Sequence, residues 1–229
     1  MQIIPGLHQI TSRNTNVFII IERKITIIDT GFRGSSRTID HALKKLGRSI
    51  SEVSHIFITH NHLDHIGGLP ELIRKTQAKT AVHKADLSFG EQGLPYGGFI
   101  KWLLKFPGIS FFWPLIYATP DDFDILLEGG EVFDPLGGME ILHTPGHTPG
   151  SISLLLRHKK LIIIGDILNN GRGELHLTPQ SVSSDMSQVR ESVRRLAQIN
   201  FEIMCFGHGR PIIGEASAML KDFVKRKNL

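Results

Sequence analysis

Cysteine, long apolar runs and low-complexity tracts are scarce or missing in this sequence of 229 residues. It holds one cysteine, which excludes a disulfide framework and a structural zinc site made of several thiolates. A single cysteine fits a reducing compartment, and we expect a cytoplasmic protein. The longest uncharged run in the most apolar region, 106–120, has 15 residues, whereas a membrane-spanning helix needs roughly 18 to 20. The sequence therefore predicts no transmembrane segment. The start, MQIIPGLHQI, lacks a basic region and predicts no cleaved signal.

Histidine, in contrast, is plentiful. The composition is that of a globular protein, with 41% hydrophobic and 21% charged residues, and the length suits one domain with or without an insertion. The formal charge of +4 forms no basic stripe, so we expect no nucleic-acid partner. Twelve histidines stand out against this background, because histidine is the commonest metal ligand and the usual proton carrier near neutral pH. Their clustering therefore decides whether the chain carries a metal site.

Hydrophobic periodicity divides most of the chain into alternating strands and helices. Strands are predicted at 16–22, 24–29, 53–59, 79–83, 139–143, 151–156, 160–164 and 202–206. Helices are predicted at 36–46, 69–76, 185–199 and 216–227. Ser35 or Ser36 can cap the first helix, and Asp185 lies near the start of the third. Because this order recurs in two halves that each end in a loop able to bind metal, we expect one domain, 1–229, built as an α/β sandwich of sheets flanked by helices.

The segment at about 87–124 differs from the rest in composition. Nine of the 17 aromatic residues lie between Tyr96 and Phe123, among glycines and prolines. We expect an insertion of short helices and turns. It forms either a small satellite core or a hydrophobic lid over the substrate, and a homodimer contact or a peripheral lipid contact is compatible with both. The candidates for substrate contact are Phe99, Trp102, Phe106 and Trp113.

The strongest local signal is the run HNHLDH at 60–65, which directly follows a predicted buried strand. Burying three histidines and an aspartate so close together would be costly without a compensating partner. Bound metal is such a partner, because imidazole and carboxylate suit zinc, iron and manganese. In an extended strand end His60 and His62 point the same way, and a turn then directs Asp64 and His65 toward a second point. One loop can therefore serve two metals.

Three further residues stand where aliphatic strands end. His147 lies in the loop TPGHTPG, Asp166 follows the strand sequence IIIG, and His208 lies between two glycines after the last predicted strand. Each alone is a weak signal, but all share the context of the 60–65 run. A carboxylate such as Asp166 suits a position that bridges two cations.

Taken in order, HNHLDH, TPGHTPGS, GD and GHG resemble the motifs of the metallo-β-lactamase superfamily of metallohydrolases, and the resemblance spans 29–208. It implies a four-layer αββα sandwich with two divalent metal ions at one edge of the sheets, zinc by preference and iron or manganese otherwise. It implies His60, His62 and His147 as the first metal site, Asp64, His65 and His208 as the second, and Asp166 as the bridge. Asp29, which ends the strand TIIDTG, resembles the aspartate of the family's first motif and would orient a ligand histidine.

The resemblance also implies a hydrolase in which a hydroxide shared by the metals attacks a carbonyl or phosphoryl centre of a small-molecule substrate, with Asp64 and Asp166 as catalytic residues. True β-lactamases lack the bridging aspartate. Glyoxalase II-type thioesterases have a longer C-terminal region than the 21 residues after His208, and quorum-quenching lactonases carry tyrosine where Asn169 stands. A generic ester, thioester or lactone hydrolase remains, and the aromatic segment favours an apolar acyl group. Arg172 is a candidate for binding an acidic group of the substrate.

Other classes stay open. Some superfamily members use iron for oxygen, nitric oxide or persulfide chemistry, and others are phosphodiesterases or nucleases. A binding protein with a degenerate site is a further alternative, although all seven ligand positions hold side chains that can bind metal. The other seven histidines, and Cys205 in a predicted buried strand, are expected to be ordinary surface or core residues.

Overall fold

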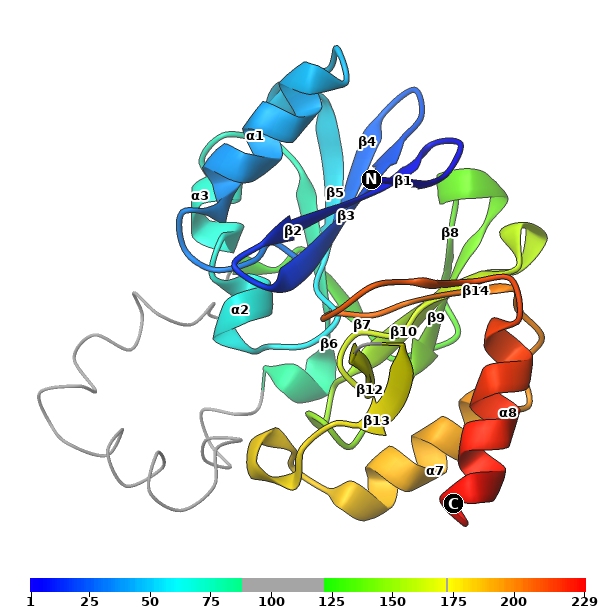
Figure 1. Ribbon diagram of the computed structural model, residues 1–229. Coiled ribbons are helices and arrows are strands. Elements are labelled where there is room, and N and C mark those ends of the chain that lie inside the picture. The colour runs from blue at the N-terminus through cyan, green and yellow to red at the C-terminus, as the bar shows by residue number, and fades with distance from the viewer. Residues whose placement is uncertain (88–121, 172) are drawn as a thin grey trace, which may run out of the picture.

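The computed structural model describes residues 1–87, 122–171 and 173–229. In this part of the chain two β-sheets lie face to face (Figure 1). One of them, here called the N-terminal sheet, has seven strands arranged in chain order: β1 (Gln2–Ile4), β2 (Leu7–Ser12), β3 (Thr15–Ile21), β4 (Ile25–Ile28), β5 (Val53–Phe57), β6 (Lys79–His83) and β7 (Ile125–Leu127). The strands from β1 to β4 pair antiparallel, and those from β4 to β7 pair parallel.

The second sheet, called the C-terminal sheet, has six described strands in the order β15, β14, β11, β10, β9, β8. Their bounds are β8 (Val132–Phe133), β9 (Met139–His143), β10 (Ile152–Leu156), β11 (Leu161–Ile163), β14 (Ile203–Cys205) and β15 (Ile212–Ile213). Here β11 and β14 run parallel. A separate antiparallel hairpin follows β11 and is formed by β12 (Leu168–Gly171) and β13 (Glu174–Leu177).

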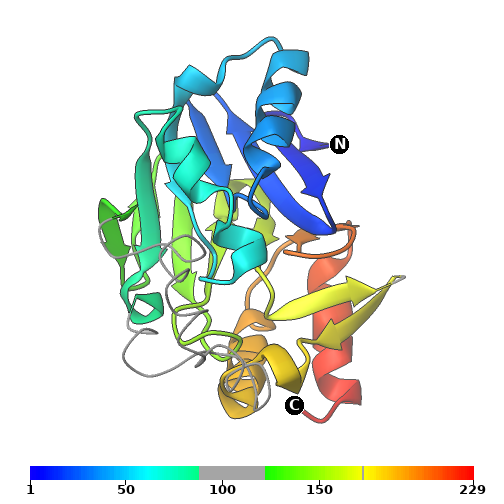
Figure 2. The same cartoon turned by 90° about the vertical axis from the view of Figure 1, so that its left-hand side faces the viewer.

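Helices form the two outer layers (Figures 1 and 2). The N-terminal sheet is covered by α1 (Ser35–Lys45) and α3 (Leu69–Ile73), whose Ile39 and Leu72 are buried in one cluster with Ile27 of the sheet. The C-terminal sheet is covered by α7 (Met186–Leu196) and α8 (Ala216–Arg226), whose Val193 and Phe223 are buried with strand residues of that sheet. Each helix therefore turns its apolar face inward, as its periodicity predicts.

The central layer is an apolar core between the two sheets. Phe18 and Phe57 of the N-terminal sheet are fully buried in one cluster with Leu154 and Cys205 of the C-terminal sheet. Phe57 also meets Phe133 edge to face, with ring centroids 4.8 Å apart. Two sheets that share a core and carry helices outside confirm the predicted αββα sandwich.

The start of α1 differs from the prediction. Its N-cap is Gly34, with no capping side chain. Ser35 instead pairs with Ser12 at 2.8 Å, and Ser36 donates to the carboxylate of Glu71, so neither serine caps the helix. The prediction of a serine cap was wrong because tertiary partners take both hydroxyl groups.

Some elements were not predicted. Strand β2 and the β12–β13 hairpin contain buried polar residues such as Gln9 and Asn170, so local hydrophobicity underrates them. A short helix, α2 (Leu63–Ile66), begins within the HNHLDH run and ends one residue beyond it, and the unpredicted strand β7 starts at Ile125. The predicted aromatic insertion lies almost wholly outside the described residues, so its conformation stays a prediction.

The topology brings the ends of several strands to one edge of the sandwich. Because β4, β5 and β6 run parallel, the residues that follow them meet at the same edge of the N-terminal sheet. Asp166 and His208 follow the parallel strands β11 and β14 in the same way. Among the described helices, none is both long enough and apolar enough to cross a membrane.

Candidate metal centre

The loop after β5 contributes four of the seven predicted ligands. His62 still has extended backbone, with φ −101° and ψ 148°, before the chain turns into α2. Asp64 and His65 lie on that turn and belong to a second group of donor atoms, whereas His60 and His62 belong to a first group. The change from extended to helical backbone is what divides the loop between two groups of side chains.

This turn packs closely against the residues that follow β4. A Cβ on Gly68 would collide with the carbonyl oxygen of Thr30, so only glycine permits the approach. Thr30 donates its backbone N–H and its hydroxyl to the carbonyl of His65, at 2.7 and 2.8 Å. Gly68 thus permits the close approach, and the two hydrogen bonds of Thr30 hold the helix that carries Asp64 and His65.

The first group of donor atoms comes from His60, His62 and His147, all buried. Each offers one ring nitrogen, and these nitrogens lie within 4.8 Å of one another. Nε2 of His60 is 3.2 Å from Nε2 of His147. Nδ1 of His147 lies 2.9 Å from the hydroxyl oxygen of Thr178, which leaves its Nε2 directed at the group.

The second group consists of Asp64, His65, Asp166 and His208, whose donor atoms also lie within 4.8 Å of one another. Nε2 of His208 is 3.1 Å from Asp64 Oδ2 and 3.0 Å from Asp166 Oδ2. Nδ1 of His208 donates to the carbonyl of Asn14 at 2.8 Å.

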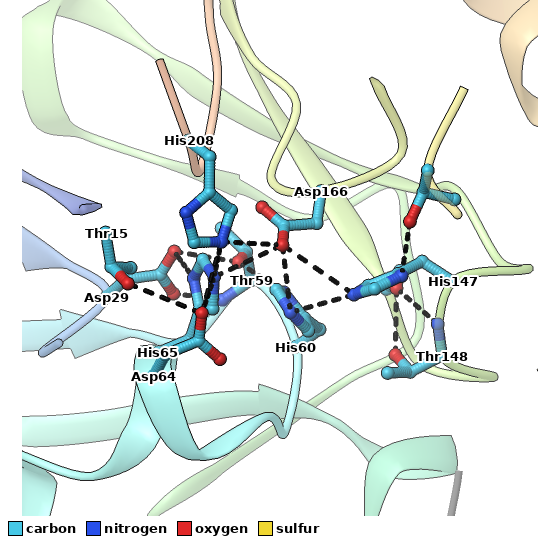
Figure 3. A network of polar contacts seen from close by, with 12 residues as sticks. Thr15, Asp29, Thr59, His60, Asp64, His65, His147, Thr148, Asp166 and His208 are labelled. Atoms are coloured by element: carbon cyan, nitrogen blue, oxygen red, sulfur yellow. Dashed lines mark hydrogen bonds and ion pairs between the residues drawn. The ribbon is translucent and has the colours of Figure 1, made fainter. Parts of the chain in front are cut away.

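Asp166 lies between the two groups (Figure 3). Its Oδ2 is 3.9 Å from His60 Nε2 and 3.8 Å from His147 Nε2 on one side, and 3.5 Å from His65 Nε2 on the other. Its Oδ1 is buried without a hydrogen-bond partner in the described part of the protein. A Cβ on Gly207 would collide with this oxygen. The unpartnered oxygen and the converging nitrogens fit two divalent cations that share Asp166.

Asp29 orients a histidine of each group. Its Oδ2 accepts the Nδ1–H of His65 at 2.8 Å and the hydroxyl of Thr59 at 2.8 Å. Because that hydroxyl hydrogen goes to Asp29, Thr59 Oγ1 is left to accept from Nδ1 of His60, 3.0 Å away. Both histidines thereby keep Nε2 as the inward donor atom, the arrangement expected where a carboxylate orients metal-binding imidazoles.

The two groups differ in their proton affinity. Burial lowers the pKa of His62 to about 3 and that of His147 to about 4, so the first group is neutral at pH 7. Burial also acts to lower the pKa of His208, but hydrogen bonds to Asp166 and Asp64 outweigh it and raise that pKa to about 10. Despite burial, the pKa of Asp64 falls to about 2, mainly through its hydrogen bond with His208. Without metal, the second group is therefore an ion-paired cluster.

Comparison with known proteins agrees with this geometry. The family model of the metallo-beta-lactamase superfamily matches residues 10–208. The chain belongs to the metallo-beta-lactamase superfamily. Among curated relatives, the probable metallo-hydrolase YflN of Bacillus subtilis is 26% identical over 92% of this chain and 86% of its own length. The probable metallo-hydrolase YqgX of the same organism is 28% identical over 84% and 83%.

Solved structures of the superfamily share the fold. A metallo-beta-lactamase family protein of Thermus thermophilus superposes with a TM-score of 0.73 at 20% identity, covering 98% of this chain and 80% of its own. An archaeal superfamily protein of Sulfolobus tokodaii gives 0.67 at 22% identity, covering 98% and 86%. The described part of this chain thus has the fold of these proteins.

All seven predicted ligand residues and Asp29 come together in the structure. The predicted substrate residues cannot be placed relative to the metal centre. All five lie outside the described residues: Phe99, Trp102, Phe106, Trp113 and Arg172. Sequence reasoning missed Thr59 and Thr178, which contact ligand histidines, and Asp86, which accepts the backbone N–H of Asn61 in the ligand loop at 2.9 Å. Asp86 carried a usable signal, since it follows β6 at the sheet edge where Asp29 and His60 follow β4 and β5.

Proposed function

We propose that the chain is a hydrolase that requires two divalent metal ions and cleaves an ester, thioester or lactone bond of a small molecule. The observation that supports this best is the place of Asp166, whose Oδ2 faces the donor nitrogens of both groups. When bound, two divalent cations supply a water molecule that ionises near neutral pH, and they polarise the carbonyl oxygen of the substrate.

The side chains of the two groups would have different roles in the reaction. The first group offers neutral imidazoles, and Asp166 balances part of the cationic charge. Asp64 is 24% exposed, whereas Asp166 is 9% exposed. We therefore assign to the Asp64 carboxylate the orientation of the attacking water. Its pKa of about 2 keeps it ionised at neutral pH, so it can accept a hydrogen bond from the attacking water and orient it.

Zinc is our proposal for the resident metal, with iron or manganese as the alternatives. Seven imidazole and carboxylate donors suit all three ions. Cys205 takes no part, because it is buried in β14 and burial raises the pKa of its thiol to about 12. The donor set also keeps an iron-dependent redox enzyme as the second candidate. Metal analysis of protein purified from its native host, together with oxygen consumption, separates the two.

The apolar acyl group, the binding of an acidic substrate group by Arg172, the homodimer, the lipid contact and the cytoplasmic location stay predictions from the sequence. An aromatic wall beside the metal centre would favour substrates with an apolar acyl chain.

The deciding experiment is a panel of chromogenic esters, thioesters, lactones and phosphodiesters, assayed with protein loaded with zinc, manganese or iron. We expect turnover on one of the carbonyl classes, and loss of that turnover in Asp166→Ala. Turnover of phosphodiesters alone would replace the proposed reaction with phosphodiester hydrolysis. Activity that survives both chelation and Asp166→Ala would contradict a metal-dependent hydrolase.

A further inference from the structure

Asp86 is a fully buried carboxylate that is not one of the candidate ligands. It ends the short 3-10 helix η2 (Lys84–Asp86) after β6. Its described partners are neutral donors: the backbone N–H of Asn61 at 2.9 Å, the hydroxyl of Thr148 at 2.9 Å and the backbone N–H of Gly150 at 2.6 Å. Burial raises its pKa to about 6 in spite of these three bonds. A buried acid held only by neutral groups is unfavourable for folding, so its position calls for another reason.

These partners belong to the two loops that carry the first group. Asn61 stands between His60 and His62, and Thr148 directly follows His147. The Asn61 amide also donates back to the carbonyl of Asp86 at 3.2 Å. The first loop leaves β5 of the N-terminal sheet and the second joins β9 to β10 of the C-terminal sheet. One side chain thus ties together loops from opposite sheets.

The contact with Asp86 leaves no room for a side chain at Gly150. A Cβ at that position would lie 2.6 Å from Cγ and Oδ1 of Asp86. Any larger residue would push the carboxylate away from the loop. The hydroxyls of Thr148 and Ser151, 2.8 Å apart, extend the same network within the His147 loop.

The contacts of Asp86 are limited to one side of the metal centre. Its carboxylate accepts hydrogen bonds from Asn61, Thr148 and Gly150, whereas Asp29 bonds directly to His65 and, through Thr59, reaches His60. Within the described residues, Asp86 forms no hydrogen bond with a member of the second group. The hydrogen bonds of Asp86 therefore reach the loops of the first group alone, whereas those of Asp29 reach both groups.

We propose that Asp86 is a positioning residue for the first ligand group, holding the His60–His62 loop and the His147 loop at the separation that a divalent cation requires. The inference rests on the two-metal centre proposed above. Loss of the Asp86 carboxylate should therefore weaken cation binding by the first group and leave the cation affinity of the second group unchanged.

The test uses cobalt(II) as the probe, titrated into metal-free full-length protein and followed by visible absorption. His208→Ala disables the second group and isolates the first, and His147→Ala does the reverse. Asp86→Asn is introduced into each of these variants. Asparagine keeps the size of the side chain, but its amide nitrogen cannot accept the hydrogen bonds that one carboxylate oxygen of Asp86 accepts. In the His208→Ala background we expect the dissociation constant for cobalt to rise about 10- to 100-fold. In the His147→Ala background it should stay within about twofold.

A matched control is Asp124→Asn. Like Asp86, Asp124 accepts hydrogen bonds from a backbone N–H and a hydroxyl, but both come from Thr80 of β6 and not from a metal loop. We expect it to leave both cobalt affinities unchanged. Urea unfolding of each metal-free variant measures any general loss of stability.

The possible results separate clearly. Weaker binding by the first group alone supports the proposal. Equal weakening of both groups, or none in either, overturns it. If the unsubstituted protein takes up no cobalt, the two-metal centre itself fails, and that result is distinct from a failure of Asp86.

Discussion

Oδ2 of Asp29 lies 2.8 Å from Nδ1 of His65, and both side chains are fully buried. Asp29 has a φ of 60°, a left-handed conformation that L-residues adopt at some cost. Its hydrogen bonds to Thr59 and His65 hold it there. The backbone at the end of β4 therefore directs the Asp29 carboxylate toward the imidazole of His65.

Asp29→Asn is expected to weaken metal binding about 10- to 100-fold at the second group. The substitution puts an amide nitrogen where a carboxylate oxygen now accepts from His65 or Thr59. The first group should lose less, because it is reached only through Thr59. Cobalt titration in the His147→Ala and His208→Ala backgrounds measures each effect. Asp40→Asn, which removes the ion-pair partner of the exposed Lys44 on α1, serves as the control. Unchanged affinity of the second group in Asp29→Asn would refute this role.

The pH dependence of metal binding should differ between the two groups. The pKa values of His62 and His147, about 3 and 4, mean that the first group binds a cation near pH 7 without releasing protons. The pKa of His208, about 10, means that its proton must leave when a cation binds. Affinity of the second group should therefore rise about tenfold per pH unit for each proton released, and fall again on acidification.

Calorimetry in buffers of different ionisation enthalpy measures this directly. Between pH 6 and 8 we expect proton release on binding by the second group and almost none on binding by the first. Equal proton release from both groups would contradict the assignment.

Asp166→Ala should lose bound metal and nearly all turnover while the protein remains folded. The alanine removes the carboxylate oxygen that faces both groups. Elemental analysis after dialysis gives the metal content, and circular dichroism gives the fold. Asp222→Asn, in an exposed ion pair on α8, should change neither. Full activity in Asp166→Ala would refute the shared position.

Gly146→Ala should reduce the free energy of unfolding and disturb His147. Gly146 has a φ of 131°, and a Cβ there would collide with the backbone nitrogen of Val189 on α7. Gly130 has a φ of 99°, and a Cβ added to it would meet no described atom within 4 Å, so Gly130→Ala measures the backbone effect alone. We expect about 1 kcal/mol for Gly130→Ala and at least about 2 kcal/mol for Gly146→Ala, from urea unfolding. Equal losses would mean that the packing against α7 tolerates a methyl group.

The αββα sandwich and the metal ligands could be predicted from local sequence patterns. The residues that hydrogen-bond to the ligands and their loops could not. Periodicity marks β3, β5 and α7 because one strong pattern covers each whole element. The histidines are visible because they crowd into short motifs. Thr178 and Asp86 are single polar residues whose meaning depends on a loop far away in the chain. Hydrogen bonds across such separations leave no local periodicity, so only the folded chain reveals them.

Each donor group draws on both halves of the chain. His60 and His147 are 87 positions apart, and His65 and His208 are 143 apart, yet each pair meets within one group. A bound ion would therefore act as a clasp between the sheets. A substitution that lets the sheets drift apart should release metal even while each sheet keeps its internal hydrogen bonds. Metal retention would then serve as a sensitive gauge of tertiary assembly, detecting damage that secondary-structure spectra overlook.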